Sequence, residues 1–195
     1  MNTYSELLAA VGAFIGQGGN SEVETQIPVF ISLGEDEIYR DLRHDRMLKT
    51  VSIGLFPFVL PDDFLEAKAF WCGDTAISYV QPDMIINSDE TSTNTVTTRW
   101  SILGNELIFD VLPSGCGELI YYAKPAPLAT EVNVLFKQNS DLFLYAALAN
   151  AMIFLHDETR LQSWVAAYQA KINSLMGVSW DERIPKAQPL VISNR

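Results

Sequence analysis

The sequence predicts an α+β fold. N- and C-terminal helices form a helical bundle, an antiparallel β region is inserted between them, and an extended C-terminal arm follows. Apolar residues recur at helical spacing near both ends of the chain and alternate with polar residues in the middle. Of the 195 residues, 48% are hydrophobic and 19% are charged, so the chain can bury a core of its own. We expect one domain over residues 1–176 and the arm over residues 177–195.

The N-terminal sequence predicts a helix over residues 4–15. Thr3 and Glu6 have the spacing of a capping box, in which each residue's side chain bonds the backbone of the other. Apolar residues follow at helical spacing, and the glycine-rich segment 16–20 ends the helix. The first residues lack a basic segment followed by an apolar run, so no signal peptide is expected.

A second helix is predicted over residues 26–43. Pro28 would lie in its first turn, where a missing backbone N–H is tolerated. Gly34 either weakens this helix or allows a neighbour to approach closely. Its apolar face carries Ile27, Phe30, Ile31, Gly34, Ile38 and Leu42. A basic group at its end is interpreted as cations that complement the helix dipole: Arg40, Arg43, His44, Arg46 and Lys49.

Residues 48–123 are predicted to form the antiparallel β region, because short apolar stretches are separated there by turn-forming residues. Pro61-Asp62-Asp63 favours a turn, and Gly104-Asn105 favours the turn of a β-hairpin. The polar segment 83–94 predicts a surface loop. The expected strands lie at 50–53, 65–71, 75–80, 95–103, 106–111 and 118–122.

A helical hairpin is predicted over residues 141–156 and 157–176. Asn139 or Ser140 would cap its first arm, and Asp157 would cap its second. The first arm is apolar nearly all round, so we expect it to be buried on most faces, although its apolar run is too short to cross a bilayer. The second arm has one apolar stripe, made of Leu161, Trp164, Val165, Tyr168, Ile172 and Leu175.

The arm over residues 177–195 is predicted to be extended. Gly177 is a common kind of helix stop, and Pro185 and Pro189 exclude a continuous helix. The apolar residues spaced along the arm are the candidate partner-binding residues: Trp180, Ile184, Pro185, Leu190, Val191 and Ile192.

The charge of the chain argues against a protein that grips nucleic acid by its phosphates. The formal net charge is −11, and the basic residues are scattered among a larger number of acidic ones. Phosphate binding requires clustered Lys and Arg. A negative tunnel wall would instead repel phosphates and let DNA slide. The four tryptophans, at positions 71, 100, 164 and 180, are therefore interpreted as core or interface residues rather than base-stacking platforms.

No catalytic, cofactor-binding or metal-binding residue is expected. The two histidines, His44 and His156, are not in a metal-binding motif. Asp62 and Asp63 are interpreted as turn residues rather than paired catalytic carboxylates. Cys116 lacks a partner base, and together with Cys72 it is interpreted as a buried small apolar residue.

Several segments resemble the head-to-tail adaptor (connector) proteins of tailed bacteriophages. The order and spacing of these segments match that family from about residue 4 to residue 176. The segments that carry the resemblance are Thr25–Ile31 running to Glu37–Arg43, Phe58–Glu66, and Leu119–Pro125 joined to Asp141–Leu148 and Trp164–Tyr168.

The resemblance implies a structural virion protein with no enzymatic activity. Members of that family form a ring, usually of twelve subunits, under the portal protein. The ring extends the DNA channel used in packaging retention and ejection, through which genomic DNA passes transiently and without sequence specificity. Its other partners would be tail tube, nozzle or fibre proteins. We expect assembly in the host cytoplasm, location at the head–tail junction of the virion, and no association with a membrane.

Three alternatives stay open from the sequence. The chain could be another tail component of similar build, such as a stopper or tail-completion protein. A small metal-dependent hydrolase is disfavoured because the sequence contains no matching motif. A nucleic-acid-binding module is disfavoured by the negative charge.

Overall fold

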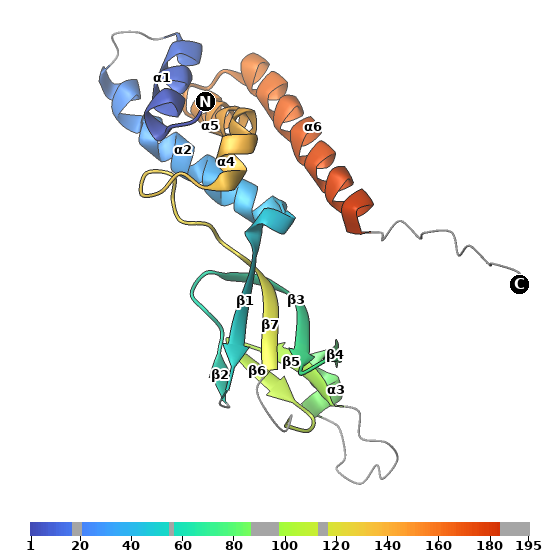
Figure 1. Cartoon of the computed structure of the whole chain (residues 1–195). Coiled ribbons are helices and arrows are strands. Elements are labelled where there is room, and N and C mark those ends of the chain that lie inside the picture. The colour runs from blue at the N-terminus through green and yellow to red at the C-terminus, as the bar shows by residue number, and fades with distance from the viewer. Residues whose placement is uncertain (17–20, 55–56, 87–97, 113–116, 184–195) are drawn as a thin grey trace, which may run out of the picture. The chain divides into compact units, whose positions relative to one another are not determined.

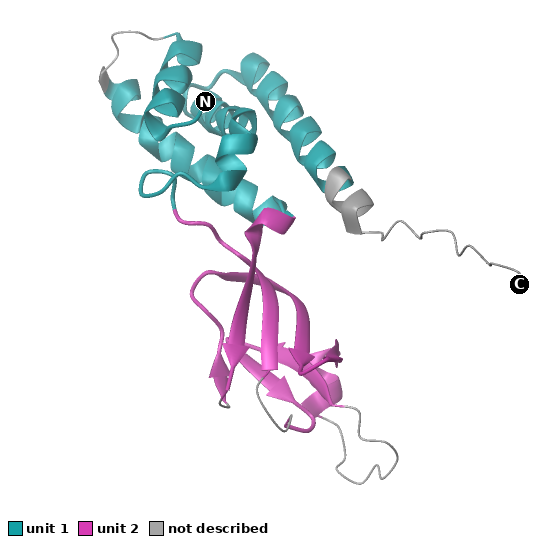
Figure 2. Cartoon of the chain, viewed as in Figure 1, with its two compact units in different colours: residues 1–44, 127–195 teal, residues 45–126 magenta. Residues whose placement is uncertain are grey.

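A computed structural model of the chain describes residues 1–16, 21–54, 57–86, 98–112 and 117–183. The chain divides into two compact units (Figure 2). Unit 1 comprises residues 1–44 and 127–195, and unit 2 comprises residues 45–126. Helices make up unit 1, and strands make up most of unit 2 (Figure 1). The α+β class predicted from the sequence is therefore confirmed.

Unit 1 is organised around a central apolar helix (Figure 1). This helix, α5, contacts the four other helices of the unit. Nine of its residues are buried, as its apolar sequence predicts: Leu142, Phe143, Leu144, Ala146, Ala147, Leu148, Ala149, Ala151 and Met152. The helices of the unit are α1 (Tyr4–Ile15), α2 (Ser21–Asp41), α4 (Val134–Gln138), α5 (Ser140–Phe154) and α6 (Glu158–Arg183).

Helices α2 and α5 pack antiparallel at very close range. The rings of Tyr39 and Phe143 lie 6.3 Å apart, and those of Phe30 and Phe154 lie 5.4 Å apart. Between these two pairs, a Cβ atom on Gly34 would lie 2.9 Å from the Cβ of Ala146. Real Cβ atoms essentially never approach so closely, so glycine is needed there, and the prediction of a close neighbour is confirmed.

Helix α1 has the predicted bounds and start. The backbone N–H of Glu6 donates to Thr3 Oγ1 at 3.2 Å. The Glu6 carboxylate accepts from the backbone N–H of Asn2 at 2.9 Å, one residue earlier than in the standard capping box. The side chains of Thr3 and Glu6 thus each accept a backbone hydrogen bond at the start of α1.

The start of α2 differs from the prediction. The helix begins at Ser21 rather than at residue 26, so Pro28 lies inside it and not in its first turn. Proline cannot supply the backbone N–H that would bond to the carbonyl of Glu24, and this segment is helical in spite of that loss. Burial of Val23, Ile27 and Phe30 along one face explains why the helix continues through the proline.

The hairpin of α5 and α6 is antiparallel, as predicted. Lys171 of α6 pairs with Asp141 at the start of α5 at 2.8 Å, and Trp164 stacks on Tyr145. The N-cap of α6 is also confirmed, since the backbone N–H of Arg160 donates to Asp157 Oδ1 at 3.0 Å. The Asn139 side chain, however, makes no capping hydrogen bond to α5. Its amide instead donates to the carbonyl of Leu135, within α4.

The end of α6 was predicted wrongly, and the short helix before α5 was not predicted. Helix α6 does not stop at Gly177 but continues to Arg183, because a glycine weakens a helix without ending it. Residues 134–138 form the short helix α4, for which the sequence analysis predicts no element. Asn133 caps α4 by accepting from the backbone N–H of Phe136 at 2.8 Å.

Unit 2 contains a seven-stranded sheet in the order β1-β7-β3-β4-β5-β6-β2. Its hairpin of β5 and β6 turns at Gly104-Asn105, as predicted. The bounds are β1 (Leu48–Ile53), β2 (Phe58–Val59), β3 (Phe64–Cys72), β4 (Thr75–Tyr79), β5 (Arg99–Leu103), β6 (Glu106–Phe109) and β7 (Gly117–Ala123).

The sheet is mostly antiparallel, but one pair departs from the prediction. Strands β4 and β5 pair in parallel, with Ser78 opposite Arg99 and Tyr79 opposite Trp100. A parallel neighbour requires a crossover connection. That connection contains the short helix α3 (Pro82–Ile86), so the surface loop predicted over residues 83–94 begins as a helix.

The core of unit 2 gathers side chains from both halves of the sheet. It is centred on Phe70 and Trp100, whose rings lie 5.8 Å apart. A Cβ atom on Gly117 would lie 2.2 Å from the Phe70 ring, so only glycine fits beside it. The buried residues of this core are Ile53, Leu60, Phe70, Trp100, Leu107, Leu119, Tyr121 and Ala123.

Candidate partner-binding surfaces

The described residues were predicted to include no metal site, and their acidic, histidine and cysteine side chains bear on that prediction. Among those residues, no group of three or more His, Cys, Asp and Glu side chains could hold a metal ion. His44 follows α2 and His156 joins α5 to α6, so the two imidazoles come from different segments. Cys72 is half-buried at the end of β3, and Cys116 lies outside the described residues. No described helix has both the length and the apolar character needed to cross a membrane.

Pro61-Asp62-Asp63 forms a turn, as predicted, and the carboxylate of Asp63 has a structural role. The backbone N–H of Phe64 closes this turn on the carbonyl of Pro61 at 2.9 Å. The Asp63 carboxylate accepts from Lys49 Nζ at 2.6 Å and from the Tyr121 hydroxyl at 3.0 Å. Burial raises the pKa of Asp63, but these two hydrogen bonds outweigh it and leave that pKa lowered. Burial and the Asp63 charge raise the pKa of Tyr121 to about 12.

A buried carboxylate holds the segment that re-enters unit 1 after the β region. Glu35 of α2 is 6% exposed. Its Oε1 accepts from the backbone N–H of Leu128 at 2.9 Å and from the Tyr39 hydroxyl at 3.4 Å. Asn133 in turn donates to the Tyr39 hydroxyl oxygen at 2.9 Å. Burial, followed by the charge of Glu35, raises the pKa of Tyr39. This network positions residues 127–133 and therefore has a structural role.

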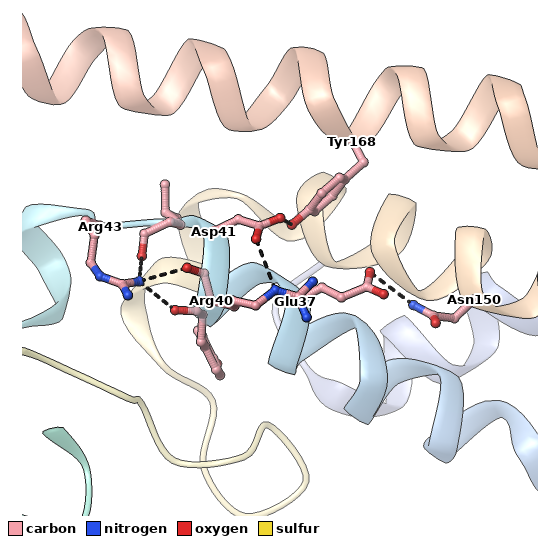
Figure 3. Close-up of polar contacts among 8 residues, drawn as sticks. Glu37, Arg40, Asp41, Arg43, Asn150 and Tyr168 are labelled. Atoms are coloured by element: carbon pink, nitrogen blue, oxygen red, sulfur yellow. Dashed lines mark hydrogen bonds and ion pairs between the residues drawn. The ribbon is translucent and has the colours of Figure 1, made fainter. Parts of the chain in front are cut away.

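The basic group at the end of α2 contains a cation that satisfies the helix terminus. Arg43 Nη1 donates to the carbonyl oxygens of Tyr39, Arg40 and Leu42, at 2.8, 3.1 and 3.0 Å (Figure 3). Because the last carbonyls of a helix have no partners within it, these bonds stabilise the end of α2. The interpretation of Arg43 as a cation complementing the helix dipole is confirmed.

Two further contacts join the same end of α2 to the hairpin (Figure 3). Asn150 of α5 donates to Glu37 Oε2 at 3.3 Å, and Tyr168 of α6 donates to Asp41 Oδ2 at 3.1 Å. Burial and the charge of Asp41 raise the pKa of Tyr168. These residues hold three helices together.

The predicted partner-binding residues lie at the edge of the described structure or beyond it. Trp180 falls within the last turns of α6 rather than in an extended arm. The others lie outside the described residues: Ile184, Pro185, Leu190, Val191 and Ile192.

Helices α2 and α5 of unit 1 expose large apolar side chains that the sequence analysis did not predict. They are Val29, Leu33, Ile153 and Phe154. These side chains are 47%, 47%, 57% and 48% exposed. Val29 and Leu33 do not belong to the apolar face predicted for α2. Apolar residues outside that face could have been recognised in the sequence as exposed side chains.

Unit 2 also exposes large apolar side chains, some of them in α3 and near it. Helix α3 contacts β5 and β6 and buries Ile85, whereas Met84 and Ile86 on either side of it are exposed. Tyr79, at the end of β4, is exposed as well. Both units therefore present apolar surface that is available to partners.

A family model described as the SU10 adaptor protein matches residues 2–190, nearly the whole chain. No curated protein matches the chain.

Proposed function

Because the chain belongs to the SU10 adaptor protein family, a family of phage head-to-tail adaptors, we propose that its subunits form the ring that joins the portal protein to the tail. The protein is a structural component of a phage virion. The family match over residues 2–190 is the observation that carries the proposal, because it spans both units. In the proposed ring, about twelve subunits extend the DNA channel and present a platform for tail components.

The surfaces of the chain support assembly into a closed ring. A ring is built from heterologous contacts, in which two different patches of each subunit meet. Unit 1 and unit 2 each expose apolar side chains that a monomer would leave in water, such as Phe154 and Ile86. The net charge of −11 suits a channel through which DNA slides, since like charges repel phosphates.

The C-terminal segment supplies the proposed contact with the portal or with a neighbouring subunit. Its apolar residues, Trp180, Ile184, Pro185, Leu190, Val191 and Ile192, are the proposed anchors. Helix α6 runs to Arg183, so the proposed contact starts in helical backbone and includes the residues that follow.

Cryo-electron microscopy of the full-length chain mixed with the portal protein of the same phage tests the ring. We expect class averages of a closed ring seated on the portal. A monomer that stays separate from the portal at micromolar concentration would contradict the proposal. A stopper or tail-completion protein would instead bind a preformed adaptor ring and not the portal alone.

Two truncations test the anchors. Deleting residues 184–195 keeps α6 whole, whereas deleting residues 178–195 also removes its last turns. We expect both truncations to weaken capture of the chain by immobilised portal, with the longer deletion weaker still because it also lacks Trp180. Ring formation in solution shows which partner the segment contacts. If the segment contacts a neighbouring subunit, the truncations should also weaken ring formation. If it contacts only the portal, the ring should still form. Full retention of both portal binding and ring formation by the longer truncation would show that the segment is not an anchor.

A further inference from the structure

Helix α6 is longer than the helix on which it packs, with 26 residues against the 15 of α5. Lys171 of α6 pairs with Asp141 in the first turn of α5 at 2.8 Å. Because the two helices are antiparallel, this pair marks the level at which α5 ends alongside α6. Helix α6 continues from there to Arg183, roughly 18 Å along its axis at about 1.5 Å per residue.

Burial along α6 ends near the same level. Ile172 is the last buried side chain in the part of this helix whose side chains the structure describes, and it is 6% exposed. From residue 173 to residue 177, every residue except the half-buried Leu175 is exposed. In this stretch, packing against α5 therefore contributes little to the stability of the helix.

The sequence at the end of α6 does not favour a helix. Residues 173–183 read Asn-Ser-Leu-Met-Gly-Val-Ser-Trp-Asp-Glu-Arg, and most of these residue types have weak helix propensity. Asp181 and Glu182 also lie in the last turn, where the helix dipole disfavours negative charge. A helix end with little burial and an unfavourable sequence is marginally stable in water.

Gly177 lowers the stability of this helix end further, and packing gives no reason for it. A Cβ atom at this position would have nothing within 4 Å, unlike one at Gly34. Gly177 is also not among the residues with a positive φ angle, so backbone conformation does not require glycine either. Inside a helix, glycine costs about 1 kcal/mol relative to alanine.

We propose that Gly177 is a joint at which the end of α6 opens in the free subunit and closes into helix when the C-terminal segment binds its partner. The residues after the joint include Trp180, the first of the proposed anchors. The partner supplies the burial that α5 does not give. Since only the closed form binds, the opening lowers the affinity of the contact. The closing step rests on the proposed function, because its partner is the portal or a neighbouring subunit.

Hydrogen exchange of the full chain, without any partner, tests the opening. The backbone amides of residues 178–183 should exchange faster than those of residues 165–172. Gly177→Ala should slow exchange at residues 178–183 by about fivefold, the factor to which about 1 kcal/mol corresponds. Gly177→Pro should abolish protection there, because proline lacks the N–H and clashes with the carbonyl of Asn173. Equal protection of the two stretches in the wild type, or no change in Gly177→Ala, would overturn the joint.

Binding tests the closing. The measurements are capture of the full chain by immobilised portal and the midpoint concentration of ring formation. Gly177→Ala should strengthen one of the two by up to about fivefold, because the closed form is more populated before binding, and Gly177→Pro should weaken the same one. Gly12→Ala in α1 is the matched control, since it also replaces a glycine within a helix. It should leave exchange at the end of α6 and both binding measurements unchanged.

Two outcomes distinguish this proposal from the proposed function. If the wild type binds the portal and both Gly177 variants bind and assemble as it does, closing is not coupled to binding, while the adaptor function stands. If the wild type neither forms a ring nor binds the portal, the proposed function and the closing step both fail, whereas hydrogen exchange still decides the opening. Protected amides in α5 show that unit 1 of each variant is folded.

Discussion

Two glycines set the closest side-chain approaches in the two units. Gly34 lets α2 meet α5, and Gly117 leaves room for the ring of Phe70 in the core of unit 2. A Cβ atom at either position would enter space that is already filled. The neighbour of Gly34 is partly backbone, which cannot rotate away as a long side chain can. The requirement for glycine at position 34 is therefore set by packing and not by backbone conformation.

Gly34→Ala is expected to destabilise the protein by about 1–3 kcal/mol, because overpacking outweighs the gain of about 1 kcal/mol in helix propensity. Chemical denaturation of the full chain measures the change. Gly12→Ala is the matched control, since a Cβ atom at this helical glycine of α1 would meet Ile27 at an ordinary 3.4 Å. That variant should be as stable as the wild type or more so. Equal stability of the two variants would show that α2 and α5 can separate without cost.

Asp110 fixes the open end of the β5–β6 hairpin with three donors. Its carboxylate accepts from the backbone N–H groups of Arg99 and Val111, both at 2.7 Å, and from Arg99 Nε at 2.6 Å. Asp110→Asn keeps the shape but replaces one acceptor oxygen with a donor. We expect a loss of about 1–3 kcal/mol in unfolding free energy, measured by urea denaturation. Asp74→Asn, at an exposed turn position, serves as control and should change little.

The pH dependence of stability follows from the same carboxylate. Burial raises the pKa of Asp110, but the three hydrogen bonds outweigh it and the pKa is lowered in the folded state. A lowered pKa stabilises the folded state fully above the unfolded value of about 3.9 and loses this contribution as pH falls through the folded pKa. The wild type should therefore lose more unfolding free energy below about pH 4 than Asp110→Asn does. Parallel pH profiles would contradict this assignment.

At the scale of elements, the α5–α6 connector combines a helix end and a helix start in two residues. His156 has a φ angle of 54°, in the left-handed region that favours glycine. Its backbone N–H and that of Asp157 satisfy the last carbonyls of α5 in the pattern of a Schellman motif. Asp157 then caps α6. The antiparallel hairpin thus depends on a histidine in a strained conformation.

His156→Gly is expected to stabilise the protein by about 1 kcal/mol, because glycine adopts the left-handed conformation without the steric cost of a Cβ atom. Thermal and chemical denaturation both report this change. His156→Ala is the control: it removes the imidazole but keeps the Cβ atom, so it should give no such gain. A gain of the same size in both variants would assign the effect to the imidazole instead.

At the scale of the whole molecule, the chain builds unit 2 as an insertion within unit 1. Residues 45–126 are continuous and have their own core around Phe70 and Trp100. The two segments of unit 1 meet where Glu35 binds the backbone of Leu128 at 2.9 Å. Each unit thus has its own buried residues and its own internal contacts.

Each unit is therefore expected to fold alone. Residues 45–126, expressed by themselves, should give a β-type circular dichroism spectrum and a cooperative thermal transition. Unit 1, with His44 joined to Pro127 by a short Gly-Ser linker, should give a helical spectrum and its own transition. A non-cooperative transition in the isolated β segment would show that its core needs unit 1.

Much of this organisation could be predicted from local sequence. The bounds of α1, the apolar character of α5, the turn at Gly104-Asn105 and the cap at Asp157 all follow from periodicity, turn chemistry and capping. Each of these features depends on residues within a few positions of one another. The family resemblance, carried by such segments in order, is confirmed by the match over residues 2–190.

Tertiary structure decided what depends on residues far apart in the chain. The helical state around Pro28 depends on burial against other helices, and the parallel pairing of β4 with β5 depends on where the crossover returns. The contact between Phe30 and Phe154 exists only because α2 and α5 lie side by side. Sequence patterns report local preference, whereas these features arise from contacts between segments that only the folded chain brings together.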